Sequence, residues 1–447
     1  MYTIKELSNG VKVLIEDMPN FNSISLGVYY KTGSKDERDD ELGVAHLLEH
    51  MVFKGTEKRT AKEISEEIDN LGGHINAFTS KEITAFYTVT LSEHVEKSIE
   101  ILSDILLNST FTEENLEKEK KVVIEEIRMY QDMPEDLVHD LNSEFIIDGP
   151  QGRNILGTEE SVNGITRETL FNYFKDRYCS DNMIISLAGA VDVDKIIPIL
   201  EKYFGVFTAK SNVRNSNEGF TLNATHNIIK KDTNQVHLCF NTKGLSYLEQ
   251  DKYTLSVISN ILGGNMSSRL FQKIREDRGL CYSVYTYASS YRYDGMFTVY
   301  AGTTKENYTE VIEIIKNEFN DIRKNGVTED ELQKAKNQLL SSMIIGLETS
   351  KSRMSRMANN YIGHERIIEI DEIIKFEIES GNPLSEFTSY ASYKAKNKMT
   401  AAEKEEYLKE KEEFLKERKK TIVLTEKQIL LREHIQRVLE KRKELPF

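Results

Sequence analysis

Residues 43–50, Gly-Val-Ala-His-Leu-Leu-Glu-His, contain an H-x-x-E-H pattern that can bind a metal ion. On a helix, His46 and His50 are four residues apart and project from one face, where their ring nitrogens can hold one Zn²⁺. Glu49 lies one turn from His46 and reaches the same space, so its carboxylate can take a proton from a zinc-bound water. This pattern therefore predicts a hydrolytic zinc site.

The local alternative is a solvent-facing His/Glu pair, because the other side of the same helix has its own apolar anchors, Leu47, Leu48 and Met51. A catalytic zinc ion needs three protein ligands and one open position, so the zinc interpretation requires a third ligand elsewhere in the chain. The helix expected near 112–131 supplies the candidates.

Glu126 is the preferred candidate for the third ligand. It shares a helix face with Val122, Val123 and Tyr130. This face is expected to point towards the core, where an unpaired carboxylate is costly and a cation would compensate its charge.

Two other glutamates on this helix are expected to have different roles. Glu125 follows Lys121 by four residues and precedes Arg128 by three, so it should be paired on a solvated face. Glu119 lies two turns before Glu126 on the same face, where it can orient a ligand or tune the charge of the site.

Several runs of the sequence, taken together and in order, resemble a known family. The runs are LSNGVKVLIE, GVYYKTGSKDE, GVAHLLEHMVFKGT, LGGHINAFTSKEITAFYTVTL and EKEKKVVIEEIRMYQD. They resemble the pitrilysin/insulinase family of inverzincin metallopeptidases, and in particular its mitochondrial-processing-peptidase-like branch. The resemblance covers about residues 1–370 and does not extend into residues 376–447.

The resemblance implies a catalytic site with one Zn²⁺ per chain. It implies His46, His50 and Glu126 as the zinc ligands, and the 75 residues between His50 and Glu126 match the family's spacing. It implies Glu49 as the general base, and Glu119 as the catalytic-site glutamate that the family places seven positions before the ligand. These assignments agree with those reached from the residues themselves.

A second set of residues, in the run MSSRLFQKIREDRGLCYSVY, is implied to bind substrate. The family has an arginine and, seven positions later, a tyrosine that reach towards the substrate, and Arg275 and Tyr282 have that spacing. A guanidinium and a phenol are suitable donors to the oxyanion that forms on a peptide carbonyl. Gly279 between them is expected to end a helix. The alternative is a surface arginine and a core tyrosine.

Asn76 and Ala77, in the run Asn-Ala-Phe-Thr, match the strand that in relatives accepts the substrate backbone as an added β-strand. An edge strand suits this role because main-chain hydrogen bonds do not depend on side-chain identity. The alternative is an ordinary sheet strand. His74 nearby is not expected to be a ligand, since no residue at metal-ligand spacing accompanies it.

The elements that must position these residues follow from the hydrophobic periodicity. The first half predicts strands at 11–15, 23–30 and 77–91 and helices at 41–54, 61–71, 92–108 and 112–131, with Gly55 directly after the first helix. The second half predicts a strand at 236–240, helices at 249–262, 266–277 and 305–324, and strands within 281–302. The similar order indicates a diverged internal duplication, although unrelated α+β domains can share it.

We therefore expect an α+β protein of two similar domains, each an antiparallel sheet packed with helices, which face each other across a cavity. The polar, aperiodic residues 208–219 mark the boundary. Residues 1–210 are expected to form the N-terminal zinc-binding catalytic domain, and residues 220–375 a C-terminal substrate-holding domain of similar fold. Residues 376–447 are expected to form a divergent, charged and largely helical segment.

Composition and charge limit the classes of partner. The 447 residues are 39% hydrophobic and 30% charged, with a net charge of −14, which is typical of a globular protein and argues against a nucleic-acid partner. The sequence has neither an apolar leader nor a run of 18 apolar residues, so no membrane segment is expected. Cys179, Cys239 and Cys281 are far apart, which argues against a disulfide framework. A cytoplasmic location is therefore expected.

The sequence thus predicts a zinc-dependent endopeptidase or oligopeptidase that hydrolyses peptide bonds in extended peptides. The alternative is a non-catalytic peptide-binding or assembly subunit of a related peptidase complex, since the family includes such members. A structural protein with a fortuitous motif would have to explain two separate motif matches in the correct order. The sequence leaves open whether the chain works as a monomer, a homodimer or a heterodimer with a related subunit.

Overall fold

The computed structural model describes residues 2–207, 210–211, 219–370 and 372–373. The chain divides into two compact units that interleave along the sequence. Unit 1 consists of the described residues within Met1–Leu248, Ser289–Gly302 and Ile345–Arg366, and unit 2 of the described residues within Glu249–Ala288 and Thr303–Ile344 and after Arg366. The predicted linker lies largely, and the charged segment at 376–447 entirely, outside the described residues. The domain boundaries inferred from the sequence stay a prediction.

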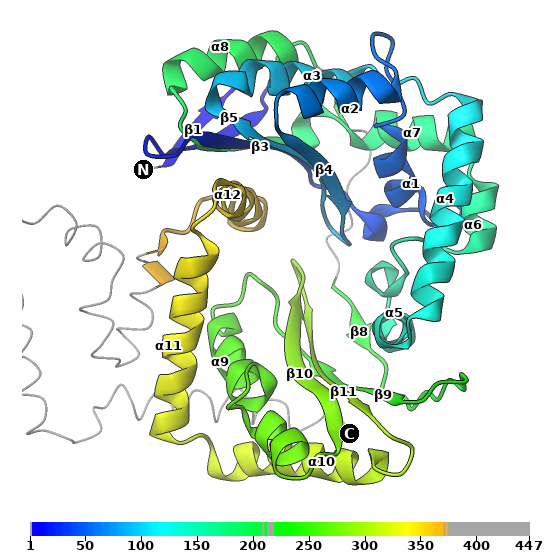
Figure 1. Cartoon of the computed structure of the whole chain (residues 1–447), viewed down its shortest axis with the longest axis vertical. Coiled ribbons are helices and arrows are strands. Elements are labelled where there is room, and N and C mark those ends of the chain that lie inside the picture. Colours follow the sequence, from blue (N-terminus) through cyan, green and yellow to red (C-terminus); the bar gives the residue numbers. More distant parts are fainter. Residues whose placement is uncertain (1, 208–209, 212–218, 371, 374–447) are drawn as a thin grey trace, which may run out of the picture. The chain divides into compact units, whose positions relative to one another are not determined.

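A six-stranded sheet with the order β1-β2-β7-β3-β5-β4 forms the centre of unit 1 (Figure 1). Its strands are β1 (Tyr2–Glu6), β2 (Lys12–Asp17), β3 (Ser23–Tyr30), β4 (His74–Thr79), β5 (Thr84–Leu91) and β7 (Met183–Gly189). All neighbouring strands are antiparallel except β2 and β7. The expected antiparallel arrangement therefore holds except at this pair, where β7 returns after a helical connection to lie between β2 and β3.

Helices flank this sheet. In unit 1 they are α1 (Val44–Met51), α2 (Ala61–Asn70), α3 (Val95–Leu107), α4 (Glu113–Asp132), α5 (Pro134–Ile146), α6 (Glu159–Gly164), α7 (Arg167–Arg177), α8 (Val193–Phe204) and α12 (Ser350–His364). Figure 1 shows α3 and α8 over one face of the sheet and α12 on the opposite face.

Strand β3 shows why different helices pack on the two faces of the six-stranded sheet. Its even-numbered residues belong to the hydrophobic core: Ile24, Leu26, Val28 and Tyr30. Its odd-numbered residues point the other way, since successive side chains alternate across a sheet. The hydroxyl oxygens of Ser25 and Ser350 are 2.9 Å apart, and the Tyr29 hydroxyl donates to Ser355 at 3.0 Å. One face is thus apolar, and the other holds α12 partly through hydroxyl groups.

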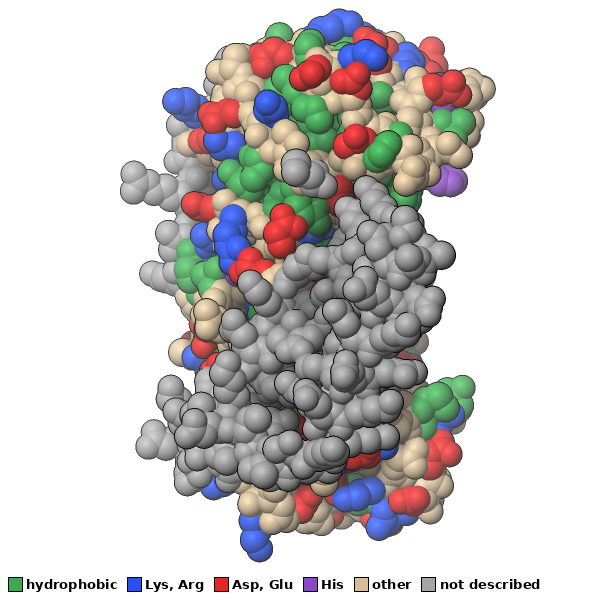
Figure 2. Space-filling view, turned by 90° about the vertical axis from the view of Figure 1, so that its left-hand side faces the viewer, with side chains coloured by type: hydrophobic (Ala, Val, Ile, Leu, Met, Phe, Trp, Pro, Cys, Tyr) green, Lys and Arg blue, Asp and Glu red, His purple; other side chains and the backbone are tan. Residues whose placement is uncertain are grey.

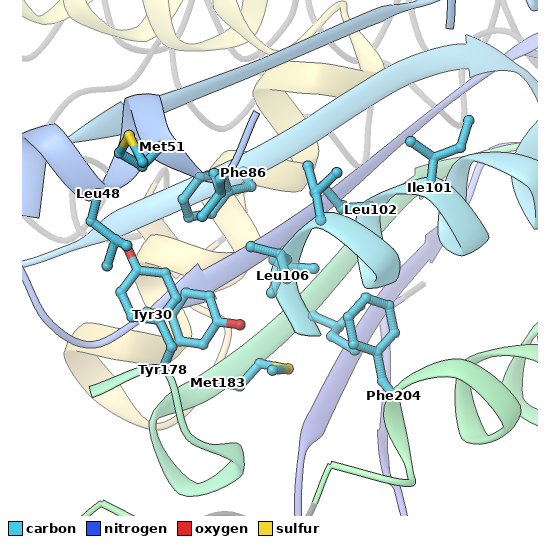
Figure 3. Close-up of a cluster of buried hydrophobic side chains, with 14 of the residues drawn as sticks. Tyr30, Leu48, Met51, Phe86, Ile101, Leu102, Leu106, Tyr178, Met183 and Phe204 are labelled. Atoms are coloured by element: carbon cyan, nitrogen blue, oxygen red, sulfur yellow. The ribbon is translucent and has the colours of Figure 1, made fainter. Parts of the chain in front are cut away.

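The core fixes helix α1 against the sheet. Figure 3 shows Leu48 and Met51 of α1 in the same cluster as Tyr30 and Phe86 of the sheet, and all four side chains are fully buried. Burying a side chain such as Leu or Met contributes about 1.5–3 kcal/mol relative to leaving it exposed. The helix that carries the H-x-x-E-H pattern therefore rests on a rigid base.

Two parts of this sheet differ from the sequence-based expectation. The predicted strand at 77–91 is two strands, β4 and β5, and Ser80 stabilises the turn between them. Its N–H and its hydroxyl both donate to the Ile83 carbonyl, at 2.8 and 2.9 Å. Neither glycine nor proline marks this turn, so the usual turn signals are absent. Strand β7 is not among the predicted elements, although all seven of its residues are buried.

Unit 2 contains α9 (Lys252–Gly263), η5 (Phe271–Glu276), α10 (Tyr308–Asn325), most of β10 (Cys281–Ser290) and most of α11 (Glu329–Gly346). Strands β9 (Val236–Lys243) and β11 (Gly295–Thr303) are neighbours in another sheet and lie almost entirely in unit 1. The mixed architecture of sheets and helices predicted from the sequence is confirmed.

The surface in Figure 2 carries charges of both signs. Over the described residues of this face, Lys and Arg side chains are interspersed with Asp and Glu side chains and with hydrophobic ones. Within the described part of the chain, no helix is both long enough and apolar enough to cross a membrane.

Candidate metal centre

Helix α1 begins at Val44, three residues later than predicted, because of the residues before it. Gly43 has a φ of +87°, and a Cβ at this position would lie 2.6 Å from the Leu156 carbonyl oxygen, which favours glycine. The buried Glu37 carboxylate accepts hydrogen bonds from the N–H groups of Gly43 at 3.0 Å and Ala45 at 2.9 Å. Burial raises the pKa of Glu37 to about 8 although these bonds lower it. The start of the helix is thus fixed by the side chain of Glu37, which satisfies N–H groups that have no partner within the helix.

The end of helix α1 also differs from the prediction. The helix ends at Met51, and Gly55, which was expected directly after it, forms a bridge with Thr60 and has a φ of +123°. The apolar anchors Leu47, Leu48 and Met51 are fully buried, as predicted. Elsewhere on the helix, His46 and His50 meet Glu126 of α4, and Glu49 meets Thr79 of β4.

His46, His50 and Glu126 come together in the structure. The Nε2 atoms of both histidines lie 3.7 Å from the same carboxylate oxygen of Glu126. One ligand atom from each residue lies within 4.8 Å of the other two. Ligand atoms around a tetrahedral Zn²⁺ are about 3.3 Å apart, so the spacing between each histidine and the carboxylate is close to what one ion needs.

The environment of His46 suits a metal ligand. The residue is only 9% exposed. Burial, and in second place the neighbouring His50, lower the pKa of His46 to about 4, so its ring is neutral at pH 7 and keeps a lone pair for a metal. Two imidazoles and a carboxylate form a donor set that Zn²⁺ accepts. The residues present therefore fit a zinc ion.

Glu119 lies beside this group and contacts one of its histidines. Its Oε2 is 3.3 Å from the Nδ1 atom of His50, and its Oε1 is 2.8 Å from the Nζ atom of Lys54. Burial alone would raise the pKa of Glu119, but the bonds to His50 and Lys54 outweigh it and lower the pKa. A carboxylate on the second ring nitrogen fixes the tautomer and orientation of a metal-binding histidine. Lys54 was not predicted from the sequence.

The glutamates of α4 point largely in the expected directions. Glu125 pairs with Arg128 at 2.7 Å on the exposed surface, as predicted. Val123 is buried but Val122 is 49% exposed, so the face that carries Glu126 is directed only partly towards the core. The expectation that Glu126 points into the core is therefore half right. Its carboxylate lies at the edge of the core, where it meets the two histidines of α1.

Glu49 is held beside the ligands by a residue that sequence reasoning missed. The Thr79 hydroxyl, at the end of β4, donates to the Oε2 atom of Glu49 at 2.6 Å. Burial raises the pKa of Glu49, and the bond from Thr79 offsets part of that effect. A raised pKa suits a carboxylate that must both accept and release a proton. Thr79 lies 30 residues from Glu49, and no local spacing connects them.

Asn76 and Ala77 lie on the edge strand of the sheet, since β4 ends the strand order. They pair with Tyr87 and Phe86 of β5, and the Ala77 N–H donates to the side-chain oxygen of Asn76 at 2.8 Å. Among the described residues, the outer edge of β4 has no partner strand. His74 is exposed on the same strand and is not part of the three-residue group.

Unit 2 places Arg275 and Tyr282 together. Arg275 belongs to η5, which is a π-helix, a form of turn often found at functional sites. Its guanidinium lies over the rings of Phe271 and Tyr282, 4.7 and 5.0 Å from their centroids. Gly279 has a φ of +60°, and its N–H donates to the Arg275 carbonyl, which confirms the predicted helix end. Tyr282 is 74% exposed, so it is not a core tyrosine.

The fold and this group of side chains define a mixed α/β protein with a candidate site for a single metal ion. Two family models match the chain, Insulinase (Peptidase family M16) over residues 12–159 and Peptidase M16 inactive domain over residues 164–339. The chain belongs to the insulinase family, peptidase family M16. All three candidate ligands, together with Glu49 and Glu119, lie within the first match.

Similar proteins carry zinc protease names. The protein named uncharacterized zinc protease YmxG of Bacillus subtilis is 42% identical over 369 residues, which cover 82% of this chain and 89% of that protein. A protein from Rickettsia felis, named uncharacterized zinc protease, is 36% identical over 380 residues, 84% of this chain and 90% of its own length.

Solved structures confirm the fold. A protease from Helicobacter pylori matches with a TM-score of 0.76 and 22% identity, covering 82% of this chain and 90% of that one. A peptidase M16 inactive domain from Pseudomonas fluorescens matches with a TM-score of 0.75 and 20% identity, covering 82% and 87%. At these identities the likeness is one of fold alone.

Proposed function

We propose that this chain is a zinc-dependent endopeptidase or oligopeptidase that hydrolyses peptide bonds in extended peptides. The observation that carries the proposal is the meeting of His46, His50 and Glu126, two of which interact electrostatically with the carboxylate of Glu49. Three ligands and a nearby base are the residues that a catalytic zinc site with one open position requires. The names of the relatives support the choice of zinc, and we expect one ion per chain.

Each residue has a distinct part in the proposed hydrolysis. His46, His50 and Glu126 would hold the ion, which when bound polarises the peptide carbonyl and makes water more acidic. Glu49 takes a proton from the attacking water and passes it to the leaving amine. Glu119 keeps the His50 ring in one orientation through its contact with Nδ1.

Arg275 and Tyr282 are proposed to bind the substrate. The guanidinium and the hydroxyl are donors suited to the negative charge that develops on the carbonyl oxygen. The exposure of Tyr282 and the partial exposure of Arg275 support this assignment, because a donor that meets substrate must be reachable by it. The Phe271 ring under the guanidinium limits the orientations that Arg275 can adopt.

The edge strand β4 supports extended peptides as the substrate class. Asn76 and Ala77 belong to this edge strand, to whose outer side a peptide can be added by main-chain hydrogen bonds. The Asn76 side chain holds the Ala77 N–H at present, so an incoming peptide has to displace it. Since the peptide must be extended to pair in this way, we expect folded proteins to be poor substrates.

The second candidate function is a non-catalytic peptide-binding or assembly subunit. The name of the family model over residues 164–339, Peptidase M16 inactive domain, favours it. The candidate ligands and the base lie outside that match, within residues 12–159. The complete set of four residues there favours the catalytic proposal.

The substitution Glu49→Gln tests the proposal, because it removes the base but none of the ligands. We expect the variant to keep the zinc content of the wild type and to lose at least about a thousandfold in the rate of cleavage of a quenched-fluorescence peptide. Glu93→Gln, at an exposed glutamate of unit 1, is the control and should cleave like the wild type. Wild-type cleavage by a zinc-loaded Glu49→Gln variant would contradict the proposed mechanism.

A further inference from the structure

Thr79 lies where the edge strand meets the candidate active site. Along β4, residues Ile75 and Ala77 pack against the core, and Thr79 is the next residue on the same face. Through this face Thr79 contacts Glu49 of α1, and Thr79 is the last residue of β4 before the chain turns. The hydroxyl of Thr79 is therefore carried to the motif helix by the regular alternation of the strand.

The contact between Thr79 and Glu49 is short and specific. The Oγ1 atom of Thr79 donates to one carboxylate oxygen of Glu49, Oε2, at 2.6 Å. Hydrogen bonds from a hydroxyl to a carboxylate have this length when they are strong. With Oε2 engaged in this way, Oε1 is the oxygen that remains for proton transfer.

The backbone on both sides of Thr79 is fixed. Its own pairing is with Thr84 across the hairpin, and the next residue, Ser80, closes the turn through Ile83. The Ser80 carbonyl also accepts the N–H of Ser34 at 3.0 Å. Gly33 allows this approach, since a Cβ there would lie 2.3 Å from the Ser80 carbonyl oxygen. The backbone around Thr79 is thus held by β5 and by the segment at Gly33 and Ser34. The hydroxyl that bonds Glu49 therefore has a fixed position.

We propose that Thr79 is a positioning residue that holds the general base and links it to the strand that receives the peptide. The proposal rests on the proposed function. The hydroxyl fixes Glu49 in one rotamer, with Oε2 bonded and Oε1 directed to the reacting water. Because Thr79 belongs to β4, a peptide that pairs with β4 is placed in register with the base. The Thr79 hydroxyl therefore affects the proton-transfer step and not the affinity for the peptide.

Three substitutions separate the hydroxyl from the rest of the side chain. Thr79→Val keeps the shape and removes the donor, Thr79→Ser keeps the donor and removes the methyl group, and Thr79→Ala removes both. We expect Thr79→Val and Thr79→Ala to lower kcat about tenfold to a hundredfold with KM within about twofold of the wild type. Thr79→Ser should stay within about threefold. If Thr79→Val does not fold, the comparison of Thr79→Ala with Thr79→Ser decides.

Zinc content should be unchanged in all three variants, because none of them alters a ligand. Wild-type kcat in Thr79→Val would overturn the proposal, and so would equal losses in Thr79→Val and Thr79→Ser, which would indicate packing alone. A change confined to KM would also overturn it, since it would place Thr79 in peptide binding.

A readout without catalysis separates this proposal from the proposed function. Crystal structures of the zinc-loaded wild type, Thr79→Val and Thr79→Ser should show the Glu49 carboxylate rotated in the valine variant and unmoved in the serine variant. An identical Glu49 rotamer in all three overturns the positioning role. Failure of the wild type to cleave any peptide, with Glu49 rotated only in Thr79→Val, would contradict the proposed function and leave the positioning of Glu49 by Thr79 established.

Discussion

The candidate metal group of unit 1 and the Arg275–Tyr282 pair of unit 2 are built in opposite ways. In the metal group two of the side chains have a second contact that fixes them: Glu119 holds His50, and Thr79 holds Glu49. In the pair of unit 2, Tyr282 is exposed and Arg275 is partly exposed, and the two hold each other mainly by stacking.

This difference teaches which part of the proposed chemistry is set before the substrate arrives. Carboxylates and imidazoles that must bind a cation need fixed, partly buried positions, because misplaced charge is costly away from water. Donors that meet a developing charge on the substrate need access instead, and a stacked guanidinium can remain exposed without losing its orientation. Substitutions in the metal group of unit 1 should therefore change zinc binding, and those in the Arg275–Tyr282 pair of unit 2 should change kcat/KM for the peptide.

The largest effect should come from Glu126→Gln, with Glu125→Gln as the matched control one residue away on the same helix. The first substitution removes a candidate ligand, so zinc content should fall close to zero and cleavage should become undetectable. The second removes only an exposed ion pair with Arg128 and should leave both quantities unchanged. Elemental analysis and a quenched-fluorescence assay measure the two outcomes. Equal zinc contents in the two variants would remove Glu126 from the ligand set.

A smaller effect on the metal is expected from Glu119→Gln. Without its carboxylate the Nδ1 atom of His50 loses its charged partner, and zinc affinity should weaken about tenfold to a hundredfold. Glu117→Gln, at an exposed position of the same helix that pairs with Lys120, should not change it. Competition with a chromogenic chelator gives both affinities. An unchanged affinity in Glu119→Gln would mean that this contact does not position His50.

Substitutions of the pair in unit 2 should leave zinc in place. Arg275→Lys and Tyr282→Phe each remove one proposed donor, so kcat/KM should fall about tenfold to a hundredfold at full zinc content. Arg278→Lys, at an exposed arginine two residues beyond η5, should remain within about twofold. Steady-state kinetics on one peptide compare the three variants. Loss of zinc in Arg275→Lys would contradict the claim that unit 1 binds the metal independently of the Arg275–Tyr282 pair.

The smallest effect should be on the stability of unit 2, through an arginine that contrasts with Arg275. Arg269 is nearly buried and forms two bonds with the Glu331 carboxylate, at 2.6 and 2.8 Å. The Arg269 guanidinium lowers the pKa of Glu331 to about 2, against the opposing effect of burial. Since the folded pKa lies below the ordinary 4.5, this stabilisation is complete above about pH 5 and is lost as the pH falls towards 2.

We therefore expect Glu331→Gln to lower the free energy of unfolding by about 1–2 kcal/mol at pH 7, with a smaller difference at pH 3. Asp330→Asn breaks only an exposed pair with Lys334 and should cost less than about 0.5 kcal/mol. Urea unfolding at the two pH values measures these differences. A gap between wild type and Glu331→Gln that widens on acidification would show that the sign of the linkage is wrong.

The sequence predicts the parts of the candidate site that lie on single helices. The i, i+4 spacing of His46 and His50 and the pairing of Glu125 with Arg128 are properties of one helix each, so periodicity is enough to find them. The same holds for Gly279, whose positive φ ends the turn before Tyr282.

The parts that sequence reasoning misses depend on contacts between elements. Thr79 reaches Glu49 only because the hairpin of β4 and β5 brings the strand end to α1, and the turn after it is closed by Ser80 without glycine or proline. Lys54 and the capping of α1 by Glu37 likewise join segments that no short spacing relates. The family resemblance supplies Arg275 and Tyr282, which periodicity alone would leave as a surface residue and a strand residue.

The measurement that tests the central claim most directly is the zinc content of the purified full chain, made together with a quenched-fluorescence peptide digest before and after chelation. We predict one zinc per chain, cleavage that stops when the chelator removes the metal, and recovery when Zn²⁺ is added back. The absence of zinc, or cleavage that continues after complete metal removal, would contradict the account. Bound zinc without cleavage of a broad set of peptides would contradict the peptidase and favour the non-catalytic subunit.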